Sequence, residues 1–182
     1  LWSSTSTSTS PEAIMSNQFW GVLQTSLGWF GALASDKGIQ RLSLPESSPE
    51  KAVEKLEPKF QDAVFEPDKF EGLRTRLERY LTGDPTPLDD TLDLASYSPF
   101  FLRAWSACRS IPRGETRSYA WLAIEAGSPR AVRAAGQAMA RNPVAIVVPC
   151  HRVIGSDGKL CGYGGGLNLK TRLLEMERAV PI

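Results

Sequence analysis

The stretch SYAWLAIEAGSPRAVRAAGQAMARNP, residues 118–143, predicts two short helices joined by a tight turn. Ser118 can cap the first helix and Gly127 can end it, because serine accepts hydrogen bonds from free N–H groups and glycine tolerates a left-handed backbone. Ser128-Pro129 then predicts the start of a second helix, which runs to about Arg141. Two helices joined in this way form a helix-turn-helix.

The second helix has two chemically different faces. At about 100° per residue, Val132, Ala135 and Met139 cluster on one side, which we expect to face the core. The opposite stripe carries basic and amide side chains around a small alanine: Arg130, Ala134, Gln137 and Arg141, with Arg133 at its edge. Such a stripe can lie against a nucleic-acid groove, although a solvated helix face can carry the same residues.

The first half of the chain has the pattern of a small sheet followed by helices. Aromatic and branched residues broken by Gly and Asp-Lys-Gly turn signals predict antiparallel strands at residues 19–25, 29–34 and 39–44. Helices are expected from Ser48-Pro49 and over Lys69 to Tyr80, and the Pro- and Asp-rich segment from Thr82 to Asp90 predicts a linker. The fold class is therefore α+β.

Three segments follow from this pattern. We expect a Ser/Thr-rich leader, either disordered or an expression remnant, then a structural N-terminal domain, then a C-terminal domain that carries the helix-turn-helix: residues 1–14, 15–94 and 95–182.

Composition limits the functional classes. A hydrophobic content of 42% in 182 residues predicts a globular protein, and no apolar run approaches the roughly 18–20 residues that span a membrane. Three cysteines without a pairing pattern favour the reducing cytoplasm. One histidine and no Cys-x-x-Cys pair leave little to hold zinc, so we expect no metal and no other cofactor.

The net charge of +1 hides a division between the two halves. Residues 1–94 hold 9 Lys+Arg and 15 Asp+Glu, whereas residues 95–182 hold 12 and 5, which gives net charges of −6 and +7. A basic half in a nearly neutral protein indicates contact with a polyanion, although uneven surface charge is common.

The segment VVPCHRVIGSDG, residues 147–158, places the single histidine of the chain beside a cysteine. The apolar run at residues 145–148 predicts a short buried strand that ends at Pro149, with Cys150 at the strand end. A free cysteine has a pKa of about 8.5, so a reactive Cys150 needs help from His151 to form a thiolate. A buried structural cysteine beside a surface histidine is the alternative.

The last predicted helix, residues 167–178, carries a carboxylate on its core-facing stripe, where Leu167, Leu174 and Glu177 fall within about 80°. A buried charge needs a partner, so Glu177 is a candidate to orient His151 in a Cys-His-Glu relay. Neighbours in an extended chain point to opposite faces, so a water could bridge Cys150 and His151.

Three ordered motifs resemble those of the alkylguanine-DNA alkyltransferases, or methylated-DNA–protein-cysteine methyltransferases: RAAGQAMARNP at 133–143, PCHRVI at 149–154 and GYGGGL at 162–167. The match is close from about residue 97 to 178. The resemblance implies an α/β-type, RNase H-like N-terminal domain with a small antiparallel sheet. It also implies a mostly helical C-terminal domain of winged-helix, helix-turn-helix type.

The resemblance implies direct-reversal DNA repair. An O6-alkylguanine, or an O4-alkylthymine, would be flipped from the duplex and its alkyl group moved irreversibly to Cys150 in a single turnover. By position, His151 would activate Cys150 through a water, and Glu177 would hold the imidazole. Asn142 would tie the helix-turn-helix to the active-site turn, and Tyr119 would push the phosphate and meet the base.

Further contacts are implied for the DNA and the flipped base. The second helix would enter the minor groove through Arg130, Arg133, Ala134, Gln137 and Arg141, with Arg133 replacing the flipped nucleotide. The pocket would be built from Met139, Val153, Cys161, Tyr163 and Gly164, with backbone groups near Cys150, Val153 and Gly164 reading the guanine. The expected partner is double-stranded DNA containing alkylated guanine, and the expected protein is a monomer without membrane contact.

Two departures from the family stand out. Residues 1–94 contain no cysteine or histidine, so the N-terminal zinc site of some relatives has no counterpart. Cys161 stands where some relatives have glycine, which predicts a narrower tolerance for bulky groups.

Other functions fit less well. A thiol hydrolase would leave the basic helix-turn-helix unexplained, a lesion sensor of this family would lack the acceptor cysteine, and a transcriptional regulator would need a further cysteine-rich domain.

Overall fold

The computed structural model describes residues 17–178, and the predicted leader at residues 1–14 lies outside them. Its main sheet contains β1 (Gln18–Thr25), β2 (Gly28–Ser35), β3 (Gly38–Leu42) and β4 (Val64–Phe65) in the order β3-β2-β1-β4. The three predicted strands are confirmed as an antiparallel meander, and β4 joins β1 in parallel.

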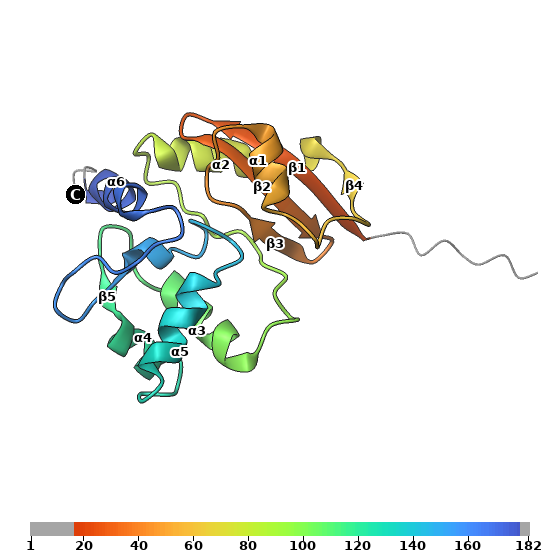
Figure 1. The fold of residues 1–182 in the computed structure, drawn as a ribbon. Coiled ribbons are helices and arrows are strands. Elements are labelled where there is room, and N and C mark those ends of the chain that lie inside the picture. The colour runs from red at the N-terminus through yellow and green to blue at the C-terminus, as the bar shows by residue number, and fades with distance from the viewer. Residues whose placement is uncertain (1–16, 179–182) are drawn as a thin grey trace, which may run out of the picture.

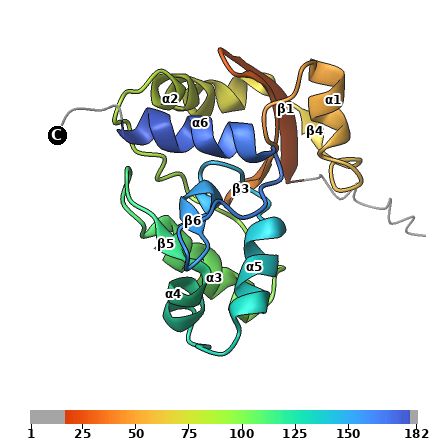
Figure 2. The ribbon, with the colours of Figure 1, turned by 60° about the vertical axis from the view of Figure 1, so that its left-hand side comes forward.

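Helices cover both faces of this sheet (Figure 2). On one side lies α1 (Pro49–Glu54), which is capped by Ser48 as predicted. On the other side lie α2 (Glu71–Leu81), entered through the 3-10 helix η1 (Pro67–Phe70), and α6 (Leu167–Arg178). The last helix of the chain therefore returns to the N-terminal half of the molecule.

Three helices form the second half of the molecule (Figure 1). They are α3 (Pro99–Arg109), α4 (Tyr119–Glu125) and α5 (Val132–Ala140), and each contacts the other two. Ser118 caps α4 and Gly127 follows it with φ of +80°, as predicted. A short parallel pair, β5 (Arg117–Ser118) and β6 (Val153–Ile154), joins the segment before α4 to the segment after Cys150.

The start of α5 differs from the prediction. Ser128-Pro129 forms a turn, which closes through a 2.8 Å hydrogen bond from the Ala131 N–H to the Ser128 carbonyl, and the helix begins only at Val132. Val132 is therefore in the first turn and 39% exposed, so its predicted core position is wrong, and Ala138 is buried instead. Leu167, in the first turn of α6, is also exposed rather than in the core.

The predicted strand at residues 145–148 is also wrong. Ile146 has φ of +68°, and two hydrogen bonds fold the segment into tight turns, from Val147 N–H to the Ala145 carbonyl and from Val148 N–H to the Val144 carbonyl. The run is buried, as a strand would be, but its backbone partner is the end of β3. There the Leu42 N–H donates to the Pro143 carbonyl at 2.9 Å, and the Leu42 carbonyl accepts from the Ala145 N–H at 3.0 Å.

One hydrophobic core extends through both halves. It includes Phe30 and Leu77 from the sheet side and Trp105, Leu122 and Val148 from the helical side. Within residues 17–178, no helix has both the length and the apolar character needed to cross a membrane.

Candidate functional site

The strained turn before Cys150 fixes the position of the thiol. A β-branched residue rarely adopts the left-handed backbone that Ile146 has, and such a conformation persists only when the surroundings hold it. Ile146 is 2% exposed, and Val148 and Cys150 are also buried. Cys150 then begins a 3-10 helix, η2 (Cys150–Arg152), rather than following a strand.

Asn142 connects the end of α5 to this turn. Its amide Nδ2 donates to the Val148 carbonyl at 2.8 Å and to the Cys150 sulfur at 3.3 Å. Its Oδ1 accepts from the Val144 N–H at 2.9 Å. One side chain thus holds both ends of the turn and also contacts the thiol.

The Cys150 thiol is protonated at rest. Burial raises its pKa, while the hydrogen bond from Asn142, the charge of Lys170 and the Tyr163 hydroxyl oppose this effect. Because burial wins, the thiol needs a base to become a thiolate.

His151 is the candidate for that base. Its ring is fully buried, and burial lowers its pKa although Glu177 favours the charged form, so the imidazole is neutral. Nε2 lies 2.8 Å from Glu177 Oε1. An ionised carboxylate can only accept, so Nε2 carries the proton and Nδ1 has the free lone pair. Among residues 17–178, Nδ1 has no hydrogen-bond partner.

The predicted relay is assembled in part. The structure brings His151 and Glu177 together, but within its described residues no hydrogen bond joins Cys150 to His151. The lone pair of Nδ1 is available to accept a hydrogen bond, so the expected bridging water stays a prediction.

Two residues that sequence reasoning missed hold Glu177. Arg152 donates from Nε at 3.1 Å and from Nη2 at 2.7 Å, and the Tyr80 hydroxyl donates to Oε1. Burial alone would raise the pKa of Glu177, but the hydrogen bonds from His151 and Arg152 hold it well below its ordinary value. The carboxylate is therefore ionised although its side chain has no exposure to solvent.

Cys150 opens into a cavity of about 900 Å³. Most of the predicted pocket and site residues line it: Tyr119, Met139, Asn142, Cys161, Tyr163 and Gly164. Val153 does not line the cavity; it is buried in β6, and its carbonyl accepts from the ammonium of Lys170 at 2.8 Å. The N-terminal half contributes a wall that the sequence did not predict, residues 41–46 and Lys55.

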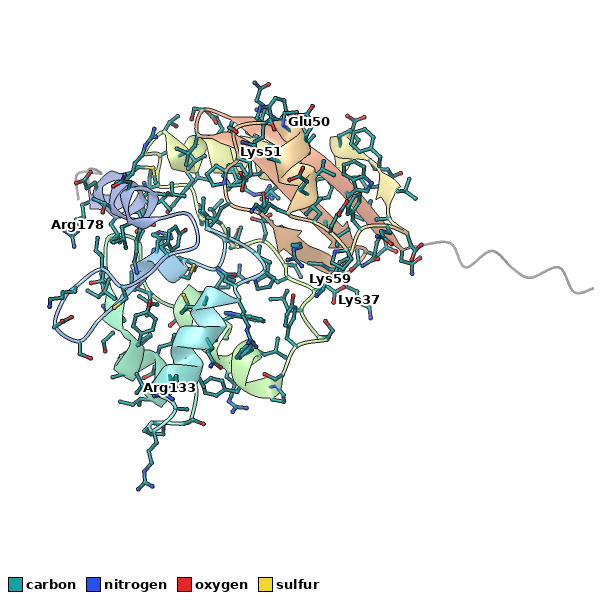
Figure 3. The ribbon with its side chains drawn as sticks, viewed as in Figure 1. Lys37, Glu50, Lys51, Lys59, Arg133 and Arg178 are labelled. Carbon is teal, nitrogen blue, oxygen red and sulfur yellow. The ribbon has the colours of Figure 1, made fainter. Side chains whose placement is uncertain are left out.

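The predicted DNA-binding stripe lies on the outer face of α5 and the turn before it. Arg130, Arg133, Gln137 and Arg141 are exposed, and Ala134 is half-buried between them. Figure 3 shows Arg133 at the end of the molecule opposite the main sheet. Tyr119, at the start of α4, is half-buried and lines the Cys150 cavity.

No group of three or more His, Cys, Asp or Glu side chains within residues 17–178 is placed to hold a metal ion.

Comparisons with known proteins converge on one family. The family model "6-O-methylguanine DNA methyltransferase, DNA binding domain" matches residues 99–179. A methylated-DNA–protein-cysteine methyltransferase of Mycobacterium tuberculosis is 50% identical over 114 residues, which are 63% of this chain and 68% of the relative. One from Methanosarcina barkeri is 38% identical over 160 residues, which are 87% of this chain and 96% of the relative.

Solved structures agree. The crystal structure of Mycobacterium tuberculosis O6-methylguanine methyltransferase is 38% identical and superposes with a TM-score of 0.76, covering 90% of this chain and 95% of that one. The structure of Mycobacterium tuberculosis OGT in complex with DNA, also 38% identical, superposes with a TM-score of 0.75 over 88% of this chain and 93% of that one. The chain therefore belongs to the methylated-DNA–protein-cysteine methyltransferase family.

Proposed function

We propose that this protein repairs DNA by moving an alkyl group from O6 of guanine to the sulfur of Cys150. The observation that carries the proposal is the arrangement around the thiol. Cys150 lines a cavity large enough for a base, and a neutral His151 held by Glu177 lies next to it in the chain.

The reaction follows from the protonation states. The thiol proton moves to Nδ1 of His151 through one water, and the thiolate attacks the alkyl carbon. The S–C bond forms while the bond from carbon to O6 breaks, and that electron pair leaves with the guanine. The guanine then takes up the proton from the imidazolium. The product is a thioether, and the cysteine thiolate is a poor leaving group from its alkyl carbon, so each chain acts once.

The base must leave the duplex to reach a buried sulfur. Extruding a nucleotide costs a few kcal/mol, and the cost is smallest for a weakly paired lesion. We propose that α4 and α5 act as the helix-turn-helix of a winged-helix domain in the minor groove, with Arg130, Gln137 and Arg141 along the backbone. Arg133 fills the space of the flipped nucleotide, and Ala134 permits close approach. The exposure of this stripe and the basic charge of the second half support the proposal.

The pocket residues have separate roles. Tyr119 displaces the phosphate and meets the base, Met139 and Tyr163 form walls, and backbone groups near Val153 and Gly164 read the guanine edge. Their positions around the cavity, Val153 excepted, support these roles. O4-alkylthymine is the second substrate of the same site.

We also propose a monomer that works in the cytoplasm, with an RNase H-like N-terminal domain that supports the site. The three cysteines are all free, as expected in a reducing compartment.

The test measures the DNA product. Increasing amounts of protein are added to a fixed amount of duplex with one O6-methylguanine, and the modified base is counted after digestion to nucleosides. We expect one lesion lost per chain and no further loss with time, and none with Cys150→Ser. Loss of many lesions per chain would indicate a turnover enzyme, and tight binding without loss would indicate a damage sensor; either result would overturn the proposal.

A further inference from the structure

A tyrosine from the N-terminal half reaches the centre of the site. Tyr80, on α2, is 2% exposed, and its hydroxyl donates to Glu177 Oε1 and lies 3.3 Å from His151 Nε2. Burial and the nearby Glu177 raise the pKa of Tyr80 far above its usual value, so the hydroxyl keeps its proton and acts as a donor to the carboxylate.

Oε1 of Glu177 is a shared acceptor. It receives hydrogen bonds from His151 Nε2 at 2.8 Å, from Arg152 Nη2 at 2.7 Å and from the Tyr80 hydroxyl. Arg152 Nε donates to the same oxygen at 3.1 Å, so the negative charge that His151 experiences is divided among four donor groups from three residues. Each donor that Oε1 accepts weakens the attraction of the carboxylate for a proton on the imidazole.

Charged and titratable groups surround His151 from several elements. Glu177 and Lys170 face it from α6, Arg152 and Cys150 belong to the same 3-10 helix, and Tyr80 approaches from α2. Arg113, from the loop before β5, stacks on the Tyr80 ring with 4.9 Å between its guanidinium carbon and the ring centroid. Of these groups, Tyr80 is the neutral donor to Glu177, so it can tune the carboxylate without adding charge.

We propose that Tyr80 is a positioning residue of the alkyl-transfer site: its hydroxyl draws charge from Glu177 and thereby keeps His151 neutral and able to accept the Cys150 proton. The role of that proton transfer in alkyl transfer rests on the proposed function. The coupling from Tyr80 through Glu177 to His151 can be measured without DNA.

The direct test uses the single histidine of the chain. Tag-free protein with labelled histidine gives an NMR signal from His151 alone, which is followed against pH in the parent protein and in Tyr80→Phe. Phenylalanine keeps the ring and its contact with Arg113 but removes the donor. We expect His151 to take up its proton at a pH about half a unit or more higher in the variant, which is about threefold or more in proton affinity. An unchanged titration would overturn the proposal.

A second readout separates tuning from packing. The rate at which iodoacetamide modifies Cys150 is followed against pH by peptide mass, with Tyr97→Phe as the control, because the Tyr97 hydroxyl contacts Lys59 and not this site. We expect Tyr80→Phe to lose reactivity at low pH, where its His151 is already protonated, and to match or exceed the parent at high pH. An equal loss at every pH would mean a packing defect and would refute the coupling. Neither assay contains a lesion, so the DNA experiment can fail while this proposal survives, and the reverse.

Discussion

Asn142 donates a hydrogen bond to the sulfur of Cys150 at 3.3 Å, so a residue two positions beyond the end of α5 contacts the thiol. The same amide holds the Val148 carbonyl at 2.8 Å. The surface that we assign to DNA and the atom that we assign to chemistry are therefore separated by one rigid side chain. A change in the position of α5 would therefore alter the hydrogen bond that Asn142 donates to the thiol.

Asn142→Ala should make Cys150 a weaker nucleophile. The hydrogen bond from Asn142 lowers the pKa of the thiol, so its loss adds to the increase already caused by burial. We expect iodoacetamide to modify Cys150 several-fold more slowly at neutral pH and the reaction to need a higher pH. The buried partners left unpaired should also cost about 1–3 kcal/mol of unfolding free energy. Asn168→Ala, on the exposed face of α6, is the control, and identical pH profiles in the two variants would contradict the role of Asn142.

Glu177→Gln should destabilise the fold in a pH-dependent way. Breaking a buried ion pair leaves Arg152 uncompensated, which typically costs about 3–5 kcal/mol. The pKa of Glu177 is depressed in the folded protein. Its stabilisation is therefore complete above the unfolded value of about 4.3 and is lost as the pH falls toward the folded value.

Denaturant unfolding at several pH values checks this prediction. The difference between parent and Glu177→Gln should be largest at neutral pH and should shrink in acid. Glu175→Gln, an exposed carboxylate on the same helix, should have little effect at any pH. A constant difference across the pH range would show that the ionised pair is not the source of the stability.

Cys161→Gly should widen the range of alkyl groups that the protein accepts. Cys161 lines the cavity that contains Cys150, and removing its side chain leaves room next to the alkyl group. We expect the ratio of benzyl to methyl transfer rates to rise, measured in single-turnover reactions on the two lesions. Cys108→Ala, in the core and outside the cavity, should leave the ratio unchanged. The same ratio in Cys161→Gly and the parent would refute this assignment.

Arg133→Ala should impair repair of duplex DNA but not the chemistry. Without a side chain to fill the stack, the extruded state loses part of the few kcal/mol that flipping requires, so the rate on duplex should fall about tenfold or more. The reaction with free O6-benzylguanine, which needs no flipping, should be unchanged. Lys37→Ala is the charge-matched control, because Figure 3 shows Lys37 far from Arg133, beside the main sheet. Equal losses on both substrates would place Arg133 in the chemistry instead.

Local signals predicted much of the fold. The meander was predictable because glycines and Asp-Lys-Gly stand at its turns, and α6 because Leu174 and Glu177 lie on one buried face at helical spacing. The start of α5 was misplaced because Ser128-Pro129 suits a helix start and a turn equally well, and only the Ala131 hydrogen bond separates the two.

Long-range contacts could not be read from the sequence. The apolar run at residues 145–148 has the composition of a strand, but its backbone is held by Leu42, about a hundred positions earlier in the chain, and by Asn142. Arg152 left a weak signal, since a buried carboxylate such as Glu177 requires a cationic partner. No pattern in the sequence pointed to Tyr80, because 97 residues separate it from Glu177 and only the return of α6 onto α2 brings them together.

Alkyl transfer to Cys150 is tested most directly by the intact mass of the protein after incubation with duplex DNA that carries O6-methylguanine, with Cys150→Ala measured in parallel. We expect a gain of one methyl group per chain, located on the Cys150 peptide, that stops at one equivalent and is absent from the variant. Binding of the lesion with no change in mass, or a methyl group on any other residue, would contradict it.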